Sequence, residues 1–146
     1  MEETTQYVTL SLDDQEYGVG ISMVNEIIRA VKPTCVPLAS PWMLGVINLR
    51  GHLIPVIDLR LRMGMQPCES TSRTRIVVLQ INDRRVGLRV DSVAEVVRVS
   101  DSEVRTPPDI MEGTEEVLGV ALLEERLVTI LNASVFVGIK EEEAAV

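Results

Sequence analysis

Aromatic residues are scarce in this sequence, which has one Trp, two Tyr and one Phe among its 146 residues. A core of this composition has to consist mainly of Val, Ile and Leu, and β-branched side chains pack well on the pleated surface of a sheet. Hydrophobic residues make up 46% of the chain and charged residues 25%, which excludes global disorder. The composition therefore predicts a packed, mostly β protein.

Residues that commonly carry catalysis are also few. His52 is the single histidine, and it lies beside a glycine in a predicted turn. The sequence therefore indicates neither a Ser-His-Asp nor a Cys-His catalytic set. Cys35 and Cys68 have no metal-ligand spacing, and we expect both to be reduced thiols. No glycine-rich phosphate-binding motif is present. The sequence predicts no catalytic residue, no metal and no cofactor, and a small-barrel hydrolase or ligand-binding enzyme stays only as a disfavoured alternative.

Positive charge is in deficit, and the formal net charge is −8. Such a chain repels nucleic-acid phosphates and anionic membranes, and an oligonucleotide-binding barrel is disfavoured further by the lack of aromatic stacking residues. No apolar run reaches the roughly 20 residues that a transmembrane helix needs, and the acidic start MEETTQ has no signal-peptide core. We expect a soluble cytoplasmic protein with a flexible acidic tail at 140–146.

An internal repeat organises what is present. Residues 7–29 align without a gap with residues 76–98, at a shift of 69 positions. Residues 45–60 align with the stretch that begins at Gly119, at a shift of 74, so two lobes are predicted at about 5–68 and 74–139 within one domain. The matched identities in the first alignment are Val8/Val77, Leu10/Leu79, Asp14/Asp83, Gly18/Gly87, Val24/Val93, Glu26/Glu95 and Arg29/Arg98.

Each copy is expected to contain a strand hairpin, a short helix, a loop and a second hairpin. The helix is predicted within Ser22–Arg29, where apolar residues follow helical spacing, and its counterpart is predicted from the S-x-x-E capping pattern of Ser92 and Glu95. Short strands avoid open edges by closing into a barrel, so two small barrels around a shared hydrophobic core are expected. Exchange of the first strand between lobes stays open. The helical face consists of Val24, Ile27 and Ile28.

The stretch NLRG, residues 48–51, lies between two predicted strands. Gly51 can adopt the positive φ of a tight turn, which would hold the Arg50 guanidinium in place for a carboxylate or a carbonyl. A solvated turn arginine is the ordinary alternative. The second copy has Glu124-Glu125-Arg126 at this point, and the asymmetry favours a function for Arg50. Asp58 is expected to cap the turn that follows its strand.

Four collinear stretches resemble the CheW family of chemotaxis coupling proteins: YGVGISMVNEI (17–27), GVINLRGHLIPVIDLR (45–60), VGLRVDSVAEVV (86–97) and VRTPPD (104–109). The resemblance covers about residues 7–139. It implies two five-stranded SH3-like barrels around a shared core. It also implies a non-enzymatic adaptor that couples the cytoplasmic tip of methyl-accepting chemoreceptors to the regulatory domain of the histidine kinase CheA.

The resemblance also implies which residues face partners. Matching the family motifs suggests receptor-facing positions on the segment after the first hairpin and a functional block around NLRG, and the repeat adds two valines near the same groove. His52 departs from the pattern, since an aliphatic residue is more usual there. The partner-binding candidates are Val24, Glu26, Gly45, Asn48, Arg50, Val90 and Val97.

Two related functions stay as alternatives. A coupling protein of a non-chemotaxis receptor-kinase array would share these motifs, and sequence alone does not separate it from a chemotaxis adaptor. The adaptor half of a CheV-type protein is disfavoured, because no receiver domain is expected in a chain that stops at Val146.

Overall fold

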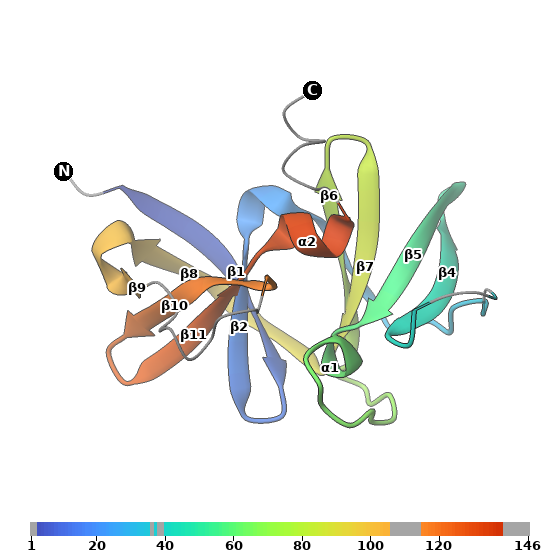
Figure 1. Cartoon of the computed structure of the whole chain (residues 1–146), viewed down its shortest axis with the longest axis horizontal. Coiled ribbons are helices and arrows are strands. Elements are labelled where there is room, and N and C mark those ends of the chain that lie inside the picture. The colour runs from blue at the N-terminus through green and yellow to red at the C-terminus, as the bar shows by residue number, and fades with distance from the viewer. Residues whose placement is uncertain (1–2, 36, 38–39, 106–114, 139–146) are drawn as a thin grey trace.

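The computed structural model describes residues 3–35, 37, 40–105 and 115–138. Figure 1 shows two β-sheets side by side, with short helices between them. The six-stranded sheet has the order β8-β1-β2-β11-β10-β9 and consists of β1 (Thr4–Leu12), β2 (Gln15–Gly20), β8 (Ser92–Ser100), β9 (Val104–Arg105), β10 (Val117–Leu123) and β11 (Arg126–Leu131). The five-stranded sheet has the order β3-β6-β7-β5-β4 and consists of β3 (Val24–Arg29), β4 (Met43–Leu49), β5 (His52–Asp58), β6 (Arg75–Ile81) and β7 (Arg84–Val90).

The helices are short in the described part of the chain. They are the 3-10 turns η1 (Ile21–Met23) and η2 (Asp101–Glu103) and the α-helices α1 (Leu59–Arg62) and α2 (Ala133–Val137). The prediction of a mostly β fold with short helices is confirmed. The six-stranded sheet has one strand more than expected, because the two residues of β9 pair with β10.

Strand pairing crosses between the two copies of the repeat. The β1–β2 hairpin pairs with β8 and, in parallel, with β11. The β6–β7 hairpin pairs with β3 and, in parallel, with β5. Each sheet therefore combines the first hairpin of one copy with later strands of the other. The division into lobes at 5–68 and 74–139 stays a prediction. The chain passes from one sheet to the other at η1, between β2 and β3, and at Asp91, between β7 and β8.

The predicted short helices in both copies are wrong. In the first copy, residues 24–29 form β3 after the single turn η1. In the second copy the whole segment 92–100 is a strand, β8. Their β-branched residues suit strands, and the backbone groups of both segments find partners in β6 and β1. Ile27 and Ile28 consequently lie on opposite faces, one exposed and one packed inside the five-stranded sheet. The capping box lies at Ser100 and Glu103 instead.

The loop expected before the second hairpin of the first copy ends where β4 begins, at Met43. Residues 106–114, which include part of the VRTPPD stretch, and the predicted tail at 140–146 lie outside the described residues. Asp58 caps α1 as predicted, since its carboxylate accepts from the backbone N–H of Arg60 at 2.9 Å.

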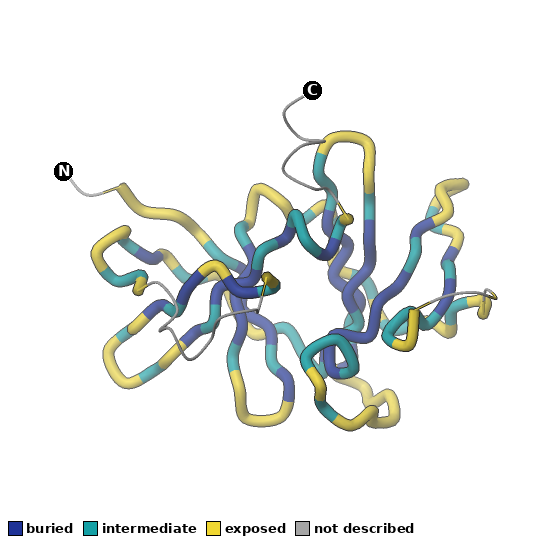
Figure 2. Tube along the Cα trace, viewed as in Figure 1, coloured by how far each residue is buried: buried dark blue, intermediate teal, exposed yellow. Residues whose placement is uncertain are grey.

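The core has one shared part and one smaller part in each sheet. The shared cluster joins Leu10, Leu12 and Val19 of the six-stranded sheet to Leu79 and Leu88 of the five-stranded sheet. Helix α2 adds a buried aromatic side chain, Phe136, to the same cluster. In Figure 2 the buried segments gather where the sheets meet, while the hairpin tips are exposed. The shared hydrophobic core predicted from the sequence is confirmed, and it fixes the sheets relative to one another.

Candidate functional site

The turn between β4 and β5 is a tight two-residue turn. Arg50 and Gly51 both have positive φ, at 52° and 85°, the combination found in type I′ hairpin turns. The side chain of Asn48 accepts a hydrogen bond from the backbone N–H of Gly51 at 2.9 Å. The positive φ predicted for Gly51 is therefore confirmed, and the Asn48 side chain stabilises the turn through its hydrogen bond. Together they fix the backbone from which the Arg50 side chain projects.

Arg50 forms a two-pronged ion pair with Glu26 of β3. Nη1 donates to Oε2, and Nη2 donates to Oε1 at 3.1 Å. The Arg50 side chain is 71% exposed and that of Glu26 24% exposed, so the pair lies at the surface. The hydrogen bond from Arg50 lowers the pKa of Glu26, and the same bond raises the pKa of Arg50. Two candidates that lie 24 positions apart thus form one ion pair, which orients the Arg50 guanidinium, and its other N–H groups have no partner among the described residues.

Gly45 brings the connector after β3 against β4. Thr34 and Val46 exchange two backbone hydrogen bonds of 2.9 Å each. A Cβ at Gly45 would lie 2.1 Å from the carbonyl oxygen of Thr34, and Gly45 itself has a φ of 145°. The residue is buried, so its role is to permit this close approach. With the Arg50–Glu26 pair, this bridge connects the two edges of the five-stranded sheet.

The three valine candidates do not share a surface. Val24 is half-buried at the start of β3 and packs against the shared core. Val90 is 1% exposed and belongs to that core, which leaves its side chain almost no surface for a partner, and its partner role stays a prediction. Val97 is half-buried on β8, opposite Tyr7, and packs against the core of the six-stranded sheet. The structure brings together Glu26, Asn48 and Arg50, with Gly45 and Val24 nearby on the same sheet.

The second copy has its own ion pair at the corresponding place. Arg126 of β11 donates to Glu95 of β8 at 2.8 Å and to Glu16 of β2 at 3.0 Å. Glu95 is the repeat counterpart of Glu26, while Arg126 lies two positions after the counterpart of Arg50. The NLRG motif occurs in one copy, but an arginine paired with the repeat glutamate is present in both. What distinguishes Arg50 is its exposure and its place on a type I′ turn.

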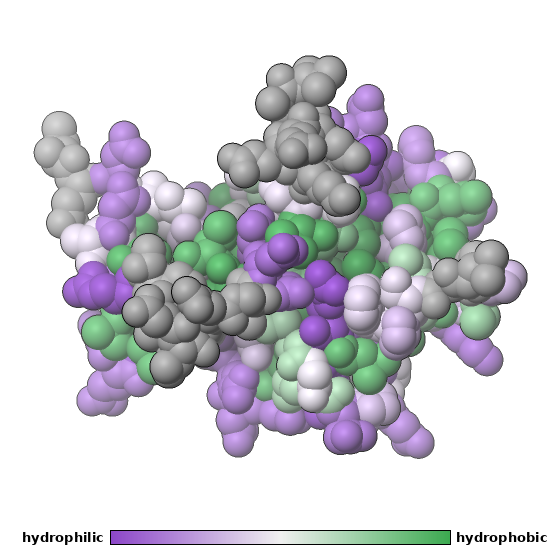
Figure 3. Space-filling view, in the orientation of Figure 1, coloured by the Kyte–Doolittle hydropathy of each residue, from purple (hydrophilic) through white to green (hydrophobic). Residues whose placement is uncertain are grey.

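Exposed apolar side chains, which the sequence analysis did not single out, mark the two ends of the molecule. Leu53 of β5 is 75% exposed, and its repeat counterpart Leu127 of β11 is 63% exposed. Their hairpins, β4–β5 and β10–β11, lie at opposite ends of the long axis (Figure 1), and Figure 3 shows hydrophobic residues at the surface over the β4–β5 end. The identity of Leu53 and Leu127 within the repeat is the signal that could have found them.

A second set of exposed apolar residues follows the crossovers between the sheets. These side chains belong to η1, to β3 and to β8, the segments through which the chain passes from one sheet to the other. A solvent-facing apolar side chain on such a segment can bury area against a partner. The set consists of Ile21, Met23, Ile27 and Val96.

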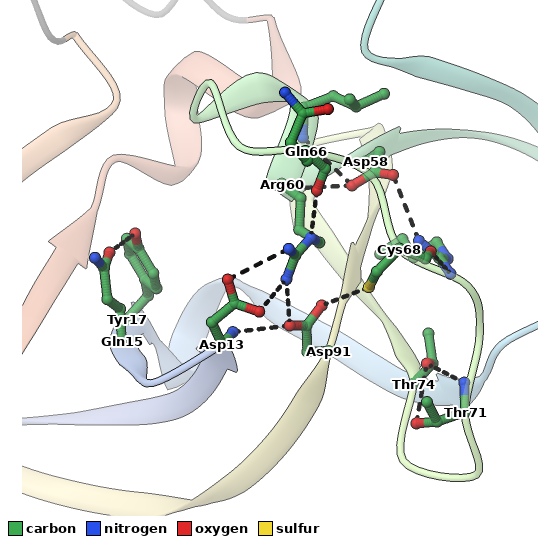
Figure 4. A network of polar contacts seen from close by, with 12 residues as sticks. Asp13, Gln15, Tyr17, Asp58, Arg60, Gln66, Cys68, Thr71, Thr74 and Asp91 are labelled. Carbon is green, nitrogen blue, oxygen red and sulfur yellow. Dashed lines mark hydrogen bonds and ion pairs between the residues drawn. The ribbon is translucent and has the colours of Figure 1, made fainter.

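A buried arginine, also absent from the candidates, joins the sheets (Figure 4). Arg60 of α1 donates through Nη1 to Asp13 and to Asp91, at 2.7 Å each, and through Nε to the carbonyl oxygen of Gln66 at 2.7 Å. Asp13 lies in the β1–β2 turn and Asp91 at the junction of β7 and β8. The hydrogen bond to Asp13 raises the pKa of Arg60. This network stabilises the relative position of the sheets rather than forming a partner surface.

Within the described ranges, no three His, Cys, Asp or Glu side chains are grouped closely enough to hold a metal ion. None of the helices in that same part of the chain has the length and hydropathy needed to cross a bilayer.

Comparison with known proteins gives a consistent result. The family model of the CheW-like domain matches residues 6–140. The chain is 37% identical to the chemotaxis protein CheW of Rhizobium meliloti, over 96% of this chain and 92% of the relative. It is 33% identical to the chemotaxis protein CheW of Bacillus subtilis, over 95% and 90% respectively. The crystal structure of the scaffolding protein TtCheW from Thermoanaerobacter tengcongensis superimposes with a TM-score of 0.83 at 32% identity, covering 89% of this chain and 90% of that one.

Proposed function

The chain belongs to the family of CheW-like domains, and from this premise we propose that it is a cytoplasmic, non-enzymatic chemotaxis adaptor that couples methyl-accepting chemoreceptors to the histidine kinase CheA. Its relatives are named chemotaxis proteins, and TtCheW is described as a scaffolding protein. The observation that carries the proposal is the exposed Arg50, which a rigid turn and Glu26 hold in one orientation.

An adaptor needs separate surfaces for its partners, and the structure offers several. The receptor tip, a helical hairpin, would bury apolar side chains against the exposed residues of the crossovers, in the manner of a helix in a groove. The kinase regulatory domain would contact an end of the molecule, where Leu53 or Leu127 supplies an apolar anchor. Arg50 lies on the hairpin that carries Leu53 and would bind a carboxylate or a carbonyl of a partner.

Coupling of this kind requires no chemical step by the adaptor. The adaptor holds receptor and kinase in a fixed register, and a receptor state that binds differently shifts the population of active kinase. The rigidity of the shared core supports this role, because a displacement at one surface is transmitted through packed sheets rather than absorbed.

The test is co-sedimentation of the adaptor with receptor-containing membranes and CheA. Arg50→Glu should weaken assembly by roughly tenfold or more, because charge-assisted hydrogen bonds are among the stronger single contacts. Arg73→Glu, which makes the same charge change at an exposed loop residue, serves as the matched control. Thermal denaturation of both variants checks that neither is unfolded.

The double variant Glu26→Arg/Arg50→Glu refines the result. It restores the internal ion pair with reversed charges, so recovery of assembly would assign the importance of Arg50 to the pair itself. Continued loss would indicate that a partner contacts Arg50 directly. Normal co-sedimentation of Arg50→Glu would contradict the proposed role of this residue, and failure of the native chain to assemble with either partner would contradict the proposed function.

A further inference from the structure

A small cleft lies between β3 and the loop that leads into β6. Its volume is about 330 Å³, which is at the lower end of the range for small-molecule sites. We propose that this cleft binds phosphate, either free or as a small phosphomonoester. The proposal does not depend on the adaptor function. The cleft is lined by Arg29, Ala30, Ser70, Thr71, Ser72, Thr74 and Arg75.

Two arginines from neighbouring strands line the cleft. Arg29 of β3 and Arg75 of β6 are direct partners in the strand register, an arrangement that is unfavourable for like charges without an anion between them. Neither forms an ion pair with a carboxylate in the described ranges, although the chain as a whole is acidic. Arg75 donates through Nη1 to the carbonyl oxygens of Ser72 and Thr74, at 2.8 and 2.9 Å. These bonds hold its guanidinium at the loop.

The loop before β6 has a conformation that its own hydroxyl groups stabilise. Thr74 accepts at Oγ1 from the backbone N–H of Thr71 at 2.8 Å, and Thr71 accepts at Oγ1 from that of Arg73 at 3.1 Å. Figure 4 shows the side chains of Thr71 and Thr74 turned toward each other inside the loop. Ser70 accepts from Arg89 at 3.0 Å, which leaves its own O–H available to donate to a ligand. The cleft thus offers the Ser70 hydroxyl and the two guanidinium groups as donors, beside a loop whose conformation Thr71 and Thr74 stabilise.

This combination suits a phosphate better than other anions. Guanidinium groups form paired hydrogen bonds with phosphate oxygens, and an oxyanion with several acceptor atoms can engage two arginines and the Ser70 hydroxyl together. A polyanion such as nucleic acid is disfavoured by the net charge of −8. The small volume of the cleft also favours a small ligand.

The internal repeat supplies a comparison within the same molecule. Arg98 of β8 is the counterpart of Arg29 and is also exposed. Its partner in the strand register is Gln6, at the position where the other sheet has Arg75. The paired arginines are therefore specific to one sheet, and Arg98 is a matched control for the removal of a single exposed positive charge.

The experiment is a titration of the full-length protein with inorganic phosphate at constant ionic strength, followed by amide chemical shifts. We expect saturable binding, with shifts confined to Ser70, Thr71, Thr74 and their neighbours. Arg29→Gln should weaken binding by roughly tenfold or more, because it removes charge-assisted bonds to the anion, whereas Arg98→Gln should change it by less than about twofold.

A second titration with glycerol phosphate distinguishes the two sources of the anion. Binding at least as tight as that of inorganic phosphate would assign the cleft to phosphomonoesters, and weaker binding would restrict it to free phosphate. The proposal is overturned if neither probe saturates, or if Arg29→Gln and Arg98→Gln weaken binding equally. Because the Arg29 side chain makes no described hydrogen bond or ion pair, its substitution should leave the fold intact, which thermal denaturation verifies.

Discussion

Replacement of Arg60 by alanine should destabilise the protein, because it removes the positive charge that holds two carboxylates together where the sheets meet. The Arg60 side chain is 8% exposed and satisfies two carboxylates and one backbone carbonyl. Without it, Asp13 and Asp91 keep their negative charges next to each other, and the carbonyl oxygen of Gln66 loses its donor. The three groups come from a hairpin turn, a strand junction and a loop, so the damage falls on the contact between the sheets.

The magnitude follows from how far each group can regain water. Removal of one partner from a fully buried ion pair costs about 3–5 kcal/mol, because the remaining charge stays buried and unpaired. The Asp13 side chain is 59% exposed and that of Asp91 24% exposed, so both can rehydrate in part. We therefore expect a loss of about 2–3 kcal/mol in the free energy of unfolding. For a chain of this length the melting temperature should fall by about 5–10 °C.

The assay is urea denaturation followed by the fluorescence of Trp42, which packs against the shared core and is the single tryptophan of the chain. A double-mutant cycle with Asp91→Asn should be less than additive, since both changes remove the same contact. Arg98→Ala, at an exposed strand position, should stay within about 0.5 kcal/mol of the native chain. Equal stability of Arg60→Ala and the native chain, or full additivity in the cycle, would refute the stabilising role of the ion pairs that Arg60 forms with Asp13 and Asp91.

Three further predictions address the core and the candidate site. Gly45→Ala should destabilise the protein by roughly 2 kcal/mol or more, measured by urea denaturation, since the added methyl group would lie 2.1 Å from a carbonyl oxygen. Leu88→Ala, at a position with 0% exposure, should cost about 2–5 kcal/mol, whereas Leu53→Ala should cost less than about 0.5 kcal/mol. The lowered pKa of Glu26 means that its pair with Arg50 adds stability above the ordinary value of 4.5 and loses it as the pH falls through the lowered value. A carboxyl NMR titration should show that pKa moving up toward 4.5 in Arg50→Gln, and an unchanged pKa would contradict the pairing.

Some of the candidate site was accessible from sequence because its geometry is local. The positive φ of Gly51 and the capping role of Asp58 depend on neighbouring residues, and both were predicted correctly. The helices expected after each first hairpin failed because the spacing of Val24, Ile27 and Ile28 also fits a strand whose faces differ in burial. Short segments of this kind take the conformation that their partner strand offers.

The sequence by itself determined the mostly β class, the internal repeat and the family motifs, since each depends on composition or on the order of residues along the chain. Only the tertiary structure decided which hairpin pairs with which sheet, that Glu26 meets Arg50, and that Arg29 and Arg75 are partners in the strand register. Strand pairing joins segments far apart in the chain, and a single sequence does not specify which of several similar strands become neighbours. Contacts between distant segments, including the bonds from Arg60 to Asp13 and Asp91, depend on which strands become neighbours.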